Sequence, residues 1–167
     1  MVLAIPEISP FPVHPIFPTR FPPMSQYPHH YSVAAAGRPD QWVTLSRTGL
    51  PTLQSAAPVE FGGPGDQWSP EDLLVAAVAD CFVLSFRAIA AASKFTWIDL
   101  QCTATGKLDR VDRKVCFTEI QIVAKLTIPA DSPPDRAKML LEKSEASCFI
   151  TNSLTAQKHL EIELVVA

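Results

Sequence analysis

The chain has 167 residues, a formal net charge of −3 and four cysteines. This length suits one domain with its own core, and the charge, without any run of lysine or arginine, argues against nucleic-acid binding. No segment resembles a secretory signal, so the four cysteines indicate a reducing compartment rather than a disulfide framework, and we expect a cytoplasmic protein.

The first 28 residues form a proline-rich extension, distinct from the domain that we expect over residues 29–167. Each proline fixes φ and removes a backbone donor, so neither a helix nor a central strand is expected here. Apolar side chains such as Ile16 and Phe17 favour an extended strap along the body or a partner chain over a disordered tail. The prolines of this extension are Pro6, Pro10, Pro12, Pro15, Pro18, Pro22, Pro23 and Pro28.

Three short strands are predicted next, over residues 31–37, 42–47 and 52–57. Turn signals at residues 37–40 and 49–51 separate them, which favours an antiparallel meander. The glycine-rich loop at residues 62–65 then leads into a helix. Such a loop can bind phosphate, but no lysine follows in P-loop spacing and an acidic first turn would repel an anion.

A long apolar helix is predicted from Ser69 to Ser93. Ser69 is a suitable N-cap, Pro70 suits the first helical position, and an acidic turn follows. Apolar residues continue around the whole circumference, so the helix needs burial against a sheet or a second subunit. Its charges interrupt the apolar run before the roughly 20 residues of a membrane span, so we expect no such span.

Two cysteines are associated with helices. Cys81 lies in the middle of the apolar helix, and Cys148 follows a second predicted helix over residues 132–147. A free cysteine is often a small buried hydrophobe, whereas two cysteines on two helices also permit thiol chemistry. The pattern alone leaves both interpretations open.

The remaining segments alternate apolar and polar residues, which predicts strands. Residues 97–109 and 115–128 predict a long hairpin around a polar turn at 109–114, and residues 159–167 predict a final strand. Cys102 and Cys116 lie on the hairpin, and no close Cys/His pair has zinc-site spacing. Separate blocks of strands and helices predict an α+β fold.

Four segments together resemble the OsmC/Ohr family of organic hydroperoxide reductases, from about Tyr31 to the C-terminus. They are Gly37–Arg38, EFGGPG at 60–65, SPEDLLVAAVADCF at 69–82 and ASCFITNSL at 146–154. The resemblance implies antiparallel sheets wrapped around a long central helix in an intertwined homodimer. Phe149 and Ile150 follow Cys148 where the organic hydroperoxide resistance branch usually has proline and tyrosine, so the chain looks like a divergent OsmC-type member.

The resemblance also implies roles for individual residues. Cys81 corresponds to the peroxidatic cysteine and Cys148 to the resolving one, while Arg38 and Glu71 hold the thiolate. No metal, haem or flavin is implied. The resemblance implies that an external thiol, such as a dihydrolipoyl group, reduces the enzyme. The expected substrate is an organic hydroperoxide, which Cys81 would reduce to an alcohol.

Physical chemistry supports this set of residues. Burial raises a cysteine pKa, so Cys81 needs a cation such as Arg38 to favour the reactive thiolate, and Glu71 would orient that arginine. Glu71 and Cys81 are ten positions apart, about 15 Å along one helix at 1.5 Å per residue. Direct contact within one chain is therefore excluded, and we expect an antiparallel partner helix to complete the site.

Two other classes of function use the same features differently. The chain could be a small-ligand-binding or carrier protein on the same dimeric scaffold, with cysteines that take no part in catalysis. It could also be a structural stress-response protein in which the proline-rich extension serves for docking. A stoichiometric peroxide pulse distinguishes these classes, because only a peroxidase should form a Cys81–Cys148 disulfide.

Overall fold

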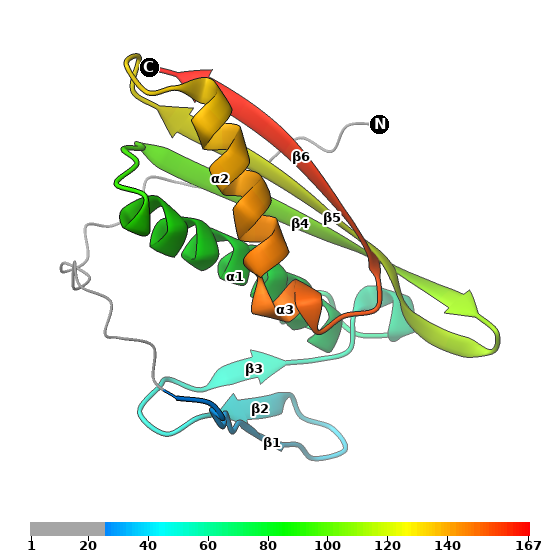
Figure 1. Cartoon of the computed structure of the whole chain (residues 1–167). Coiled ribbons are helices and arrows are strands. Elements are labelled where there is room, and N and C mark those ends of the chain that lie inside the picture. Colours follow the sequence, from blue (N-terminus) through cyan, green and yellow to red (C-terminus); the bar gives the residue numbers. More distant parts are fainter. Residues whose placement is uncertain (1–25) are drawn as a thin grey trace.

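A computed structural model describes residues 26–167 of the chain. The proline-rich extension expected over residues 1–28 lies almost wholly outside the described residues, so its strap role stays a prediction. The rest forms two three-stranded sheets, with the helices packed on one face of the larger sheet (Figure 1). This arrangement confirms the predicted α+β class.

The smaller sheet contains β1 (Ala34–Ala36), β2 (Val43–Ser46) and β3 (Leu53–Ser55) in antiparallel order. The turns between them are closed by backbone hydrogen bonds from Gln41 N–H to Arg38 C=O and from Leu50 N–H to Arg47 C=O. The predicted meander is therefore confirmed, with strands shorter than expected. Half of its ten strand residues are exposed within the single chain.

A 3-10 turn, η1 (Val59–Phe61), connects this sheet to the long helix α1 (Pro70–Ala92). Ser69 Oγ accepts a hydrogen bond from Asp72 N–H, and the Asp72 carboxylate accepts one from Ser69 N–H, each at 3.0 Å. This capping box satisfies two N-terminal donors, and Pro70 occupies the first turn. The predicted start of the helix is confirmed.

The larger sheet contains β4 (Asp99–Val111), β5 (Lys114–Ile128) and β6 (Gln157–Val166). β4 and β5 form the predicted hairpin. Its turn consists of Asp112 and Arg113, both of which have a positive φ (47° and 69°). The tip of the hairpin extends beyond the helices (Figure 1) and is exposed from Lys107 onward to the turn.

One part of the prediction, that the sheets are antiparallel, is wrong for β6. It pairs with β5 in parallel register, with Lys158 opposite Ile120 and Ile162 opposite Ala124. The reason is the crossover between the two strands, through α2 (Pro134–Ser147) and the short α3 (Phe149–Asn152). A helical crossover returns the chain to the end of the sheet at which β5 began, so the next strand runs in the same direction.

The core lies between the larger sheet and the helices α1 and α2. Alternate residues of β5 point into it, as expected for a sheet with one buried face. The core residues at or near zero exposure are Ile120, Ile122, Ala124, Leu126 and Ile128 of β5, Val78, Phe82, Phe86 and Ala90 of α1, and Ala137, Leu140 and Leu141 of α2.

α1 is less buried in the single chain than its composition predicts. One stripe, Val78, Phe82, Phe86 and Ala90, is buried, whereas Leu84 is 47% exposed. By length and composition alone α1 could cross a membrane, with a mean hydropathy of 2.0 and 22% of that window buried. This is weak evidence, because helices in protein cores pass the same test, and the stripe packs in the core.

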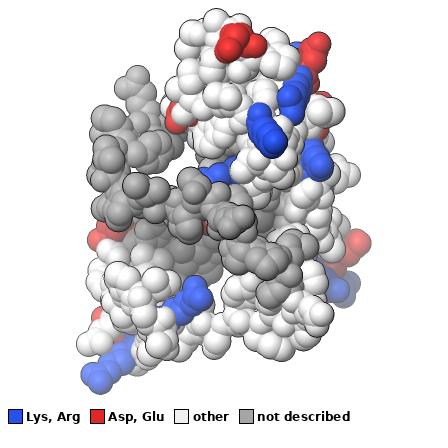
Figure 2. Space-filling model, turned by 60° about the vertical axis from the view of Figure 1, so that its left-hand side comes forward, with Lys and Arg blue, Asp and Glu red and all other residues white. Residues whose placement is uncertain are grey.

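Charged side chains are spread thinly over the face shown in Figure 2. Among the described residues there, lysine and arginine are interspersed with acidic and uncharged side chains. This distribution gives no electrostatic basis for nucleic-acid binding on that face.

Candidate functional site

Cys81 lies near the middle of α1, beside the buried stripe of that helix. It is half-buried, one position before Phe82 and one turn before Ser85. Both the capping box and the packing of Phe82 and Phe86 fix the helix that carries it, so the position of the thiol is set by the core.

Cys148 is fully buried at the junction between α2 and α3. Its backbone is extended (φ −69°, ψ 113°), which ends one helix and begins the other. Its N–H donates to Glu145 C=O at 3.1 Å, and its C=O accepts from Asn152 N–H at 3.0 Å and from Thr151 Oγ1 at 3.2 Å. The chain therefore holds this cysteine by its backbone on both sides.

The structure brings these two cysteines together. The Cys148 side chain lies close to Cys81, and the Ile150 backbone and the Ser85 side chain also lie near enough to the Cys81 sulfur to shift its pKa. Burial and the contact with Cys148 raise the pKa of the Cys81 thiol, while the bonds from Ile150 and Ser85 lower it less. Within one chain, Cys81 thus lies beside a second thiol, and its pKa is above the ordinary value of a cysteine.

Arg38 does not join this pair within one chain. It lies exposed in the loop between β1 and β2, and it is not among the groups that shift the pKa of Cys81. Among residues 26–167, its guanidinium forms no hydrogen bond or ion pair. The expected lowering of the Cys81 pKa by this arginine is therefore absent from the isolated chain.

Glu71 lies in the first turn of α1, remote from Cys81 as its place in the helix requires. Its Oε2 atom is buried and has no hydrogen-bond partner among the described residues. It borders a cavity of about 500 Å³ whose other walls include Phe61, Val75 and Phe117. A buried carboxylate oxygen without a partner is costly, so this end of the site is incomplete.

The close approach of strand and helix beside Glu71 depends on Gly106 of β4. A Cβ atom there would come within 2.6 Å of the Phe117 ring and 2.9 Å of Val75 Cγ2. Contacts under 3.0 Å would force these neighbours to move. Glycine at this position therefore allows Phe117 and Val75 to form the wall of the cavity.

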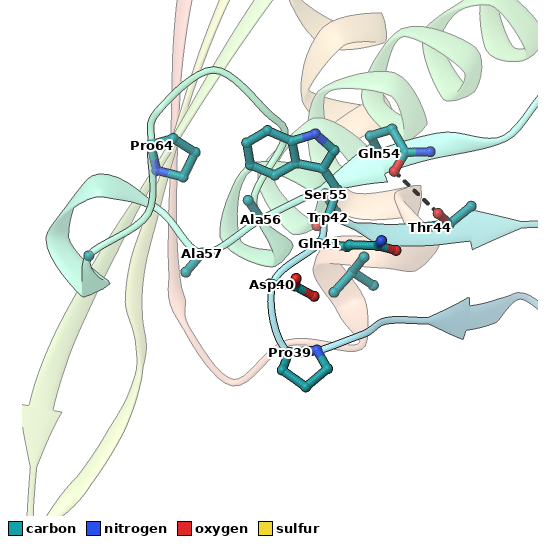
Figure 3. A pocket seen from close by; sticks show the side chains of 12 residues that line it. Pro39, Asp40, Gln41, Trp42, Thr44, Gln54, Ser55, Ala56, Ala57 and Pro64 are labelled. Atoms are coloured by element: carbon teal, nitrogen blue, oxygen red, sulfur yellow. Dashed lines mark hydrogen bonds between the residues drawn. The ribbon is translucent and has the colours of Figure 1, made fainter.

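A second cavity, of about 710 Å³, opens on the smaller sheet. In Figure 3 the Trp42 indole lies between Pro64 and Gln54, and Thr44 Oγ1 donates to Gln54 Oε1 at 3.2 Å. This cavity contains no cysteine and is formed by β2, β3 and the loops beside them. No group of three potential metal ligands occurs within residues 26–167.

The sequence did not reveal several parts of the site. Ser85 and the Ile150 backbone at the Cys81 sulfur carry no sequence signal, because one is an ordinary helical serine and the other acts through its main chain. Cys102 was assigned no function, yet burial raises the pKa of its thiol to about 12, with a further contribution from the charge of Cys148. Cys102 therefore lies close to the pair, on the face of β4 that points toward the helices.

Comparisons with known proteins agree with this fold. The family model of the OsmC-like proteins matches residues 63–163. The uncharacterized protein YmaD of Bacillus subtilis is 26% identical over 143 residues, covering 83% of this chain and 95% of its own length. Peroxiredoxin OsmC of Escherichia coli is 27% identical over 96 residues, covering 58% of this chain and 66% of its own length.

Solved structures show the same architecture. An OsmC-like protein of unknown function from Vibrio cholerae has a TM-score of 0.70 at 20% identity, covering 80% of this chain and 99% of that one. The organic hydroperoxide resistance protein OhrB of Bacillus subtilis has a TM-score of 0.59 at 18% identity, covering 80% and 96%. At these identities the likeness concerns the fold.

Proposed function

The chain belongs to the family of OsmC-like proteins, and from that premise we propose that it is a thiol-dependent peroxidase that reduces organic hydroperoxides to alcohols. The observation that carries the proposal is the proximity of Cys81 and Cys148, which are 67 positions apart in the chain but close together in the fold. The related Escherichia coli protein is named a peroxiredoxin, which supports the same class of chemistry.

The proposed reaction has two steps within the protein. The Cys81 thiolate attacks the terminal peroxide oxygen, the O–O bond breaks, and the alkoxide takes a proton and leaves as an alcohol, so Cys81 becomes a sulfenic acid. Cys148 then attacks the sulfenic sulfur, forms the Cys81–Cys148 disulfide and releases water. An external dithiol, for which we propose a dihydrolipoyl group, reduces the disulfide, and a cytoplasmic location would supply such reductants.

The first step needs an activator that one chain does not provide. Since burial and Cys148 raise the pKa of Cys81, a cation must approach the sulfur to favour the thiolate. Arg38 is exposed, and the Oε2 atom of Glu71 is buried without a partner. We propose that these two residues pair across a homodimer and that Arg38 there reaches Cys81.

The surface of α1 supports the same homodimer. An apolar helix with one buried stripe leaves the rest of its circumference to a partner, and Leu84 is the most exposed large apolar residue of α1. A second copy that covers this surface would bury it and bring the missing groups to each site.

A small-ligand-binding protein is the alternative, and the cavity beside Trp42 is the observation in its favour. An aromatic side chain with nearby amide and hydroxyl groups is typical of ligand sites. The two cysteines are not required for such binding. The alternative therefore predicts that peroxide leaves them unpaired.

Mass spectrometry after a stoichiometric peroxide pulse tests the proposal. Reduced protein treated with one equivalent of cumene hydroperoxide should lose two hydrogen atoms and yield a cross-linked peptide pair containing Cys81 and Cys148. The same pulse of hydrogen peroxide should react more slowly, because an apolar site favours an organic substrate. Protein that stays reduced, or that oxidises first at the exposed Cys116, contradicts the proposal.

A further inference from the structure

One ammonium group connects the three elements that surround Cys148. Lys158, on β6, forms an ion pair with Glu145 Oε1 at 3.3 Å and donates to Asn152 Oδ1 at 3.0 Å. Asn152 Nδ2 in turn donates to Ala146 C=O at 2.9 Å. The last turn of α2, the short α3 and the start of β6 are thus linked through side chains on both sides of the buried cysteine.

We propose that Glu145, Asn152 and Lys158, which we call the clamp, position Cys148 against Cys81 and so set the rate at which their disulfide forms. The inference rests on the proposed function, since it concerns the second step of that reaction. These three are positioning residues, because they act through the backbone of Cys148 and do not touch the reacting sulfur atoms.

The clamp acts on the same backbone groups that hold the cysteine. Glu145 C=O accepts from Cys148 N–H, and Asn152 N–H donates to Cys148 C=O, so two of the three hydrogen bonds of this residue's main chain end on clamp residues and the third comes from Thr151 Oγ1. The Ile150 backbone, which bonds to the Cys81 sulfur, lies in the same short segment. A shift of this segment would therefore move the resolving thiol and a group at the Cys81 sulfur together.

α3 depends on such side-chain support because it is only four residues long. One turn of helix has little stability of its own. Lys158 is also the sole described partner of Glu145 Oε1, which has no hydrogen bond. Removing the ammonium would leave a mostly buried carboxylate oxygen unpaired, which favours rearrangement of the turn.

The position of Cys148 matters because two reactions compete for the sulfenic acid of Cys81. Cys148 can displace its oxygen as water to give the disulfide, or a second peroxide can oxidise it to sulfinic acid. Disulfide formation requires a narrow range of distance and dihedral angle, whereas the second oxidation requires only access of peroxide. A misplaced Cys148 therefore slows the first reaction and leaves the second unchanged.

The test compares Lys158→Met with Lys107→Met. Lys107 forms an ion pair with Glu119 at 2.9 Å on the exposed hairpin, so its loss removes a similar contact far from the cysteines. In Lys158→Met, disulfide formation should slow about tenfold, since small errors in orientation are costly, and the sulfinic fraction should rise with peroxide excess. Sulfenic acid formation should stay within about twofold of the wild-type rate, because the clamp does not touch Cys81 and the Ile150 backbone affects the pKa of Cys81 less than burial does.

Two further variants separate positioning from general destabilisation. Lys158→Arg keeps the charge and should restore disulfide formation, and Asn152→Leu should slow it although this side chain is exposed. Equal rates of disulfide formation in Lys158→Met, Lys107→Met and the wild type would overturn the inference. Equal slowing of both chemical steps would overturn it as well, because that result indicates a loss of folding.

Diamide, which couples two thiols without peroxide, makes the test independent of the proposed function. If peroxide fails to oxidise wild-type Cys81 but diamide forms the disulfide more slowly in Lys158→Met, the peroxidase proposal is wrong and the clamp is supported. If the wild type reacts with peroxide but diamide and peroxide both give the variant normal disulfide rates, only the clamp is wrong. No disulfide in the wild type with either oxidant overturns both.

Discussion

The two halves of the candidate site differ in how far one chain assembles them. Cys81 and Cys148 lie close together within the single chain. Arg38, in contrast, is exposed in a loop, and Glu71 Oε2 is buried without a hydrogen-bond partner among residues 26–167. The comparison teaches that one subunit assembles the pair of thiols, whereas the two groups that we propose to activate them lie apart within that subunit.

The difference has a physical origin in the core. The cysteines lie on α1 and at the end of α2, two helices that pack together on one sheet, so the apolar core fixes their separation. Arg38 lies in an exposed loop of the smaller sheet, and half of the strand residues of that sheet are exposed in the single chain. Glu71 is held by the helix about 15 Å from Cys81.

The largest effect should come from removing the thiols themselves. Cys81→Ser should abolish peroxide turnover, because no other residue is proposed to attack the peroxide. Cys148→Ser should still consume one equivalent and stop at the sulfenic acid, which a dimedone adduct detects by mass spectrometry. Full activity in Cys81→Ser would contradict the proposal that Cys81 attacks the peroxide.

Arg38→Ala should slow the alkylation of Cys81 at neutral pH by more than about tenfold, since one pKa unit corresponds to about 1.4 kcal/mol. The sign follows from charge: without the cation, the pKa of Cys81 rises and less thiolate is present. Arg47→Ala, also exposed and in the same sheet region, is the matched control. Iodoacetamide rates against pH measure the shift, and coincident profiles for the two variants would show that Arg38 does not act on the thiol.

Mixed dimers test whether the second half of the site comes from the partner. Cys81→Ser and Arg38→Ala proteins, denatured together and refolded, should recover roughly a quarter of wild-type activity, because half of the dimers carry one intact site. Refolding each variant alone is the control. An active monomer in sedimentation, or activity no higher than that of Arg38→Ala refolded alone, would place the whole site in one chain.

The smallest effect concerns Cys102, which lies close to the pair but on the sheet. Its pKa is raised to about 12 by burial, so the unfolded chain loses this proton first and alkaline pH favours unfolding. The contribution of Cys102 to the free energy of unfolding is at its maximum below pH 9. Above pH 9 it declines by up to about 1.4 kcal/mol per pH unit. Urea unfolding of the wild type and Cys102→Val should show diverging pH profiles between pH 9 and 10; parallel profiles would mean that Cys102 is exposed to water.

Local features of the fold could be predicted from the sequence because their causes are local. Ser69, Pro70 and Asp72 specify the start of α1 through capping and proline geometry, and alternation along β5 specifies its buried face. The direction of β6 could not be predicted in the same way. Its alternating pattern is the same for parallel and antiparallel pairing, and only the crossover decides between them.

The site was predictable to a similar degree. The sequence indicated Cys81 and Cys148 through their helices and a family resemblance, and the fold brings them together. The contacts of Ser85 and the clamp depend on how α2, α3 and β6 meet, which no local pattern encodes. The roles of Arg38 and Glu71 stay predictions, because the single chain leaves them apart.

The parallel pairing of β5 and β6 has a consequence for the order of folding. Cys148 lies in the crossover between these strands, 67 positions after Cys81, so the contact between the two cysteines joins distant parts of the chain. Contacts between such distant segments form late, because closing a long loop costs entropy. A chain that is still folding therefore exposes Cys81 without its partner, and any sulfenic acid made then can only be oxidised further or await a foreign thiol.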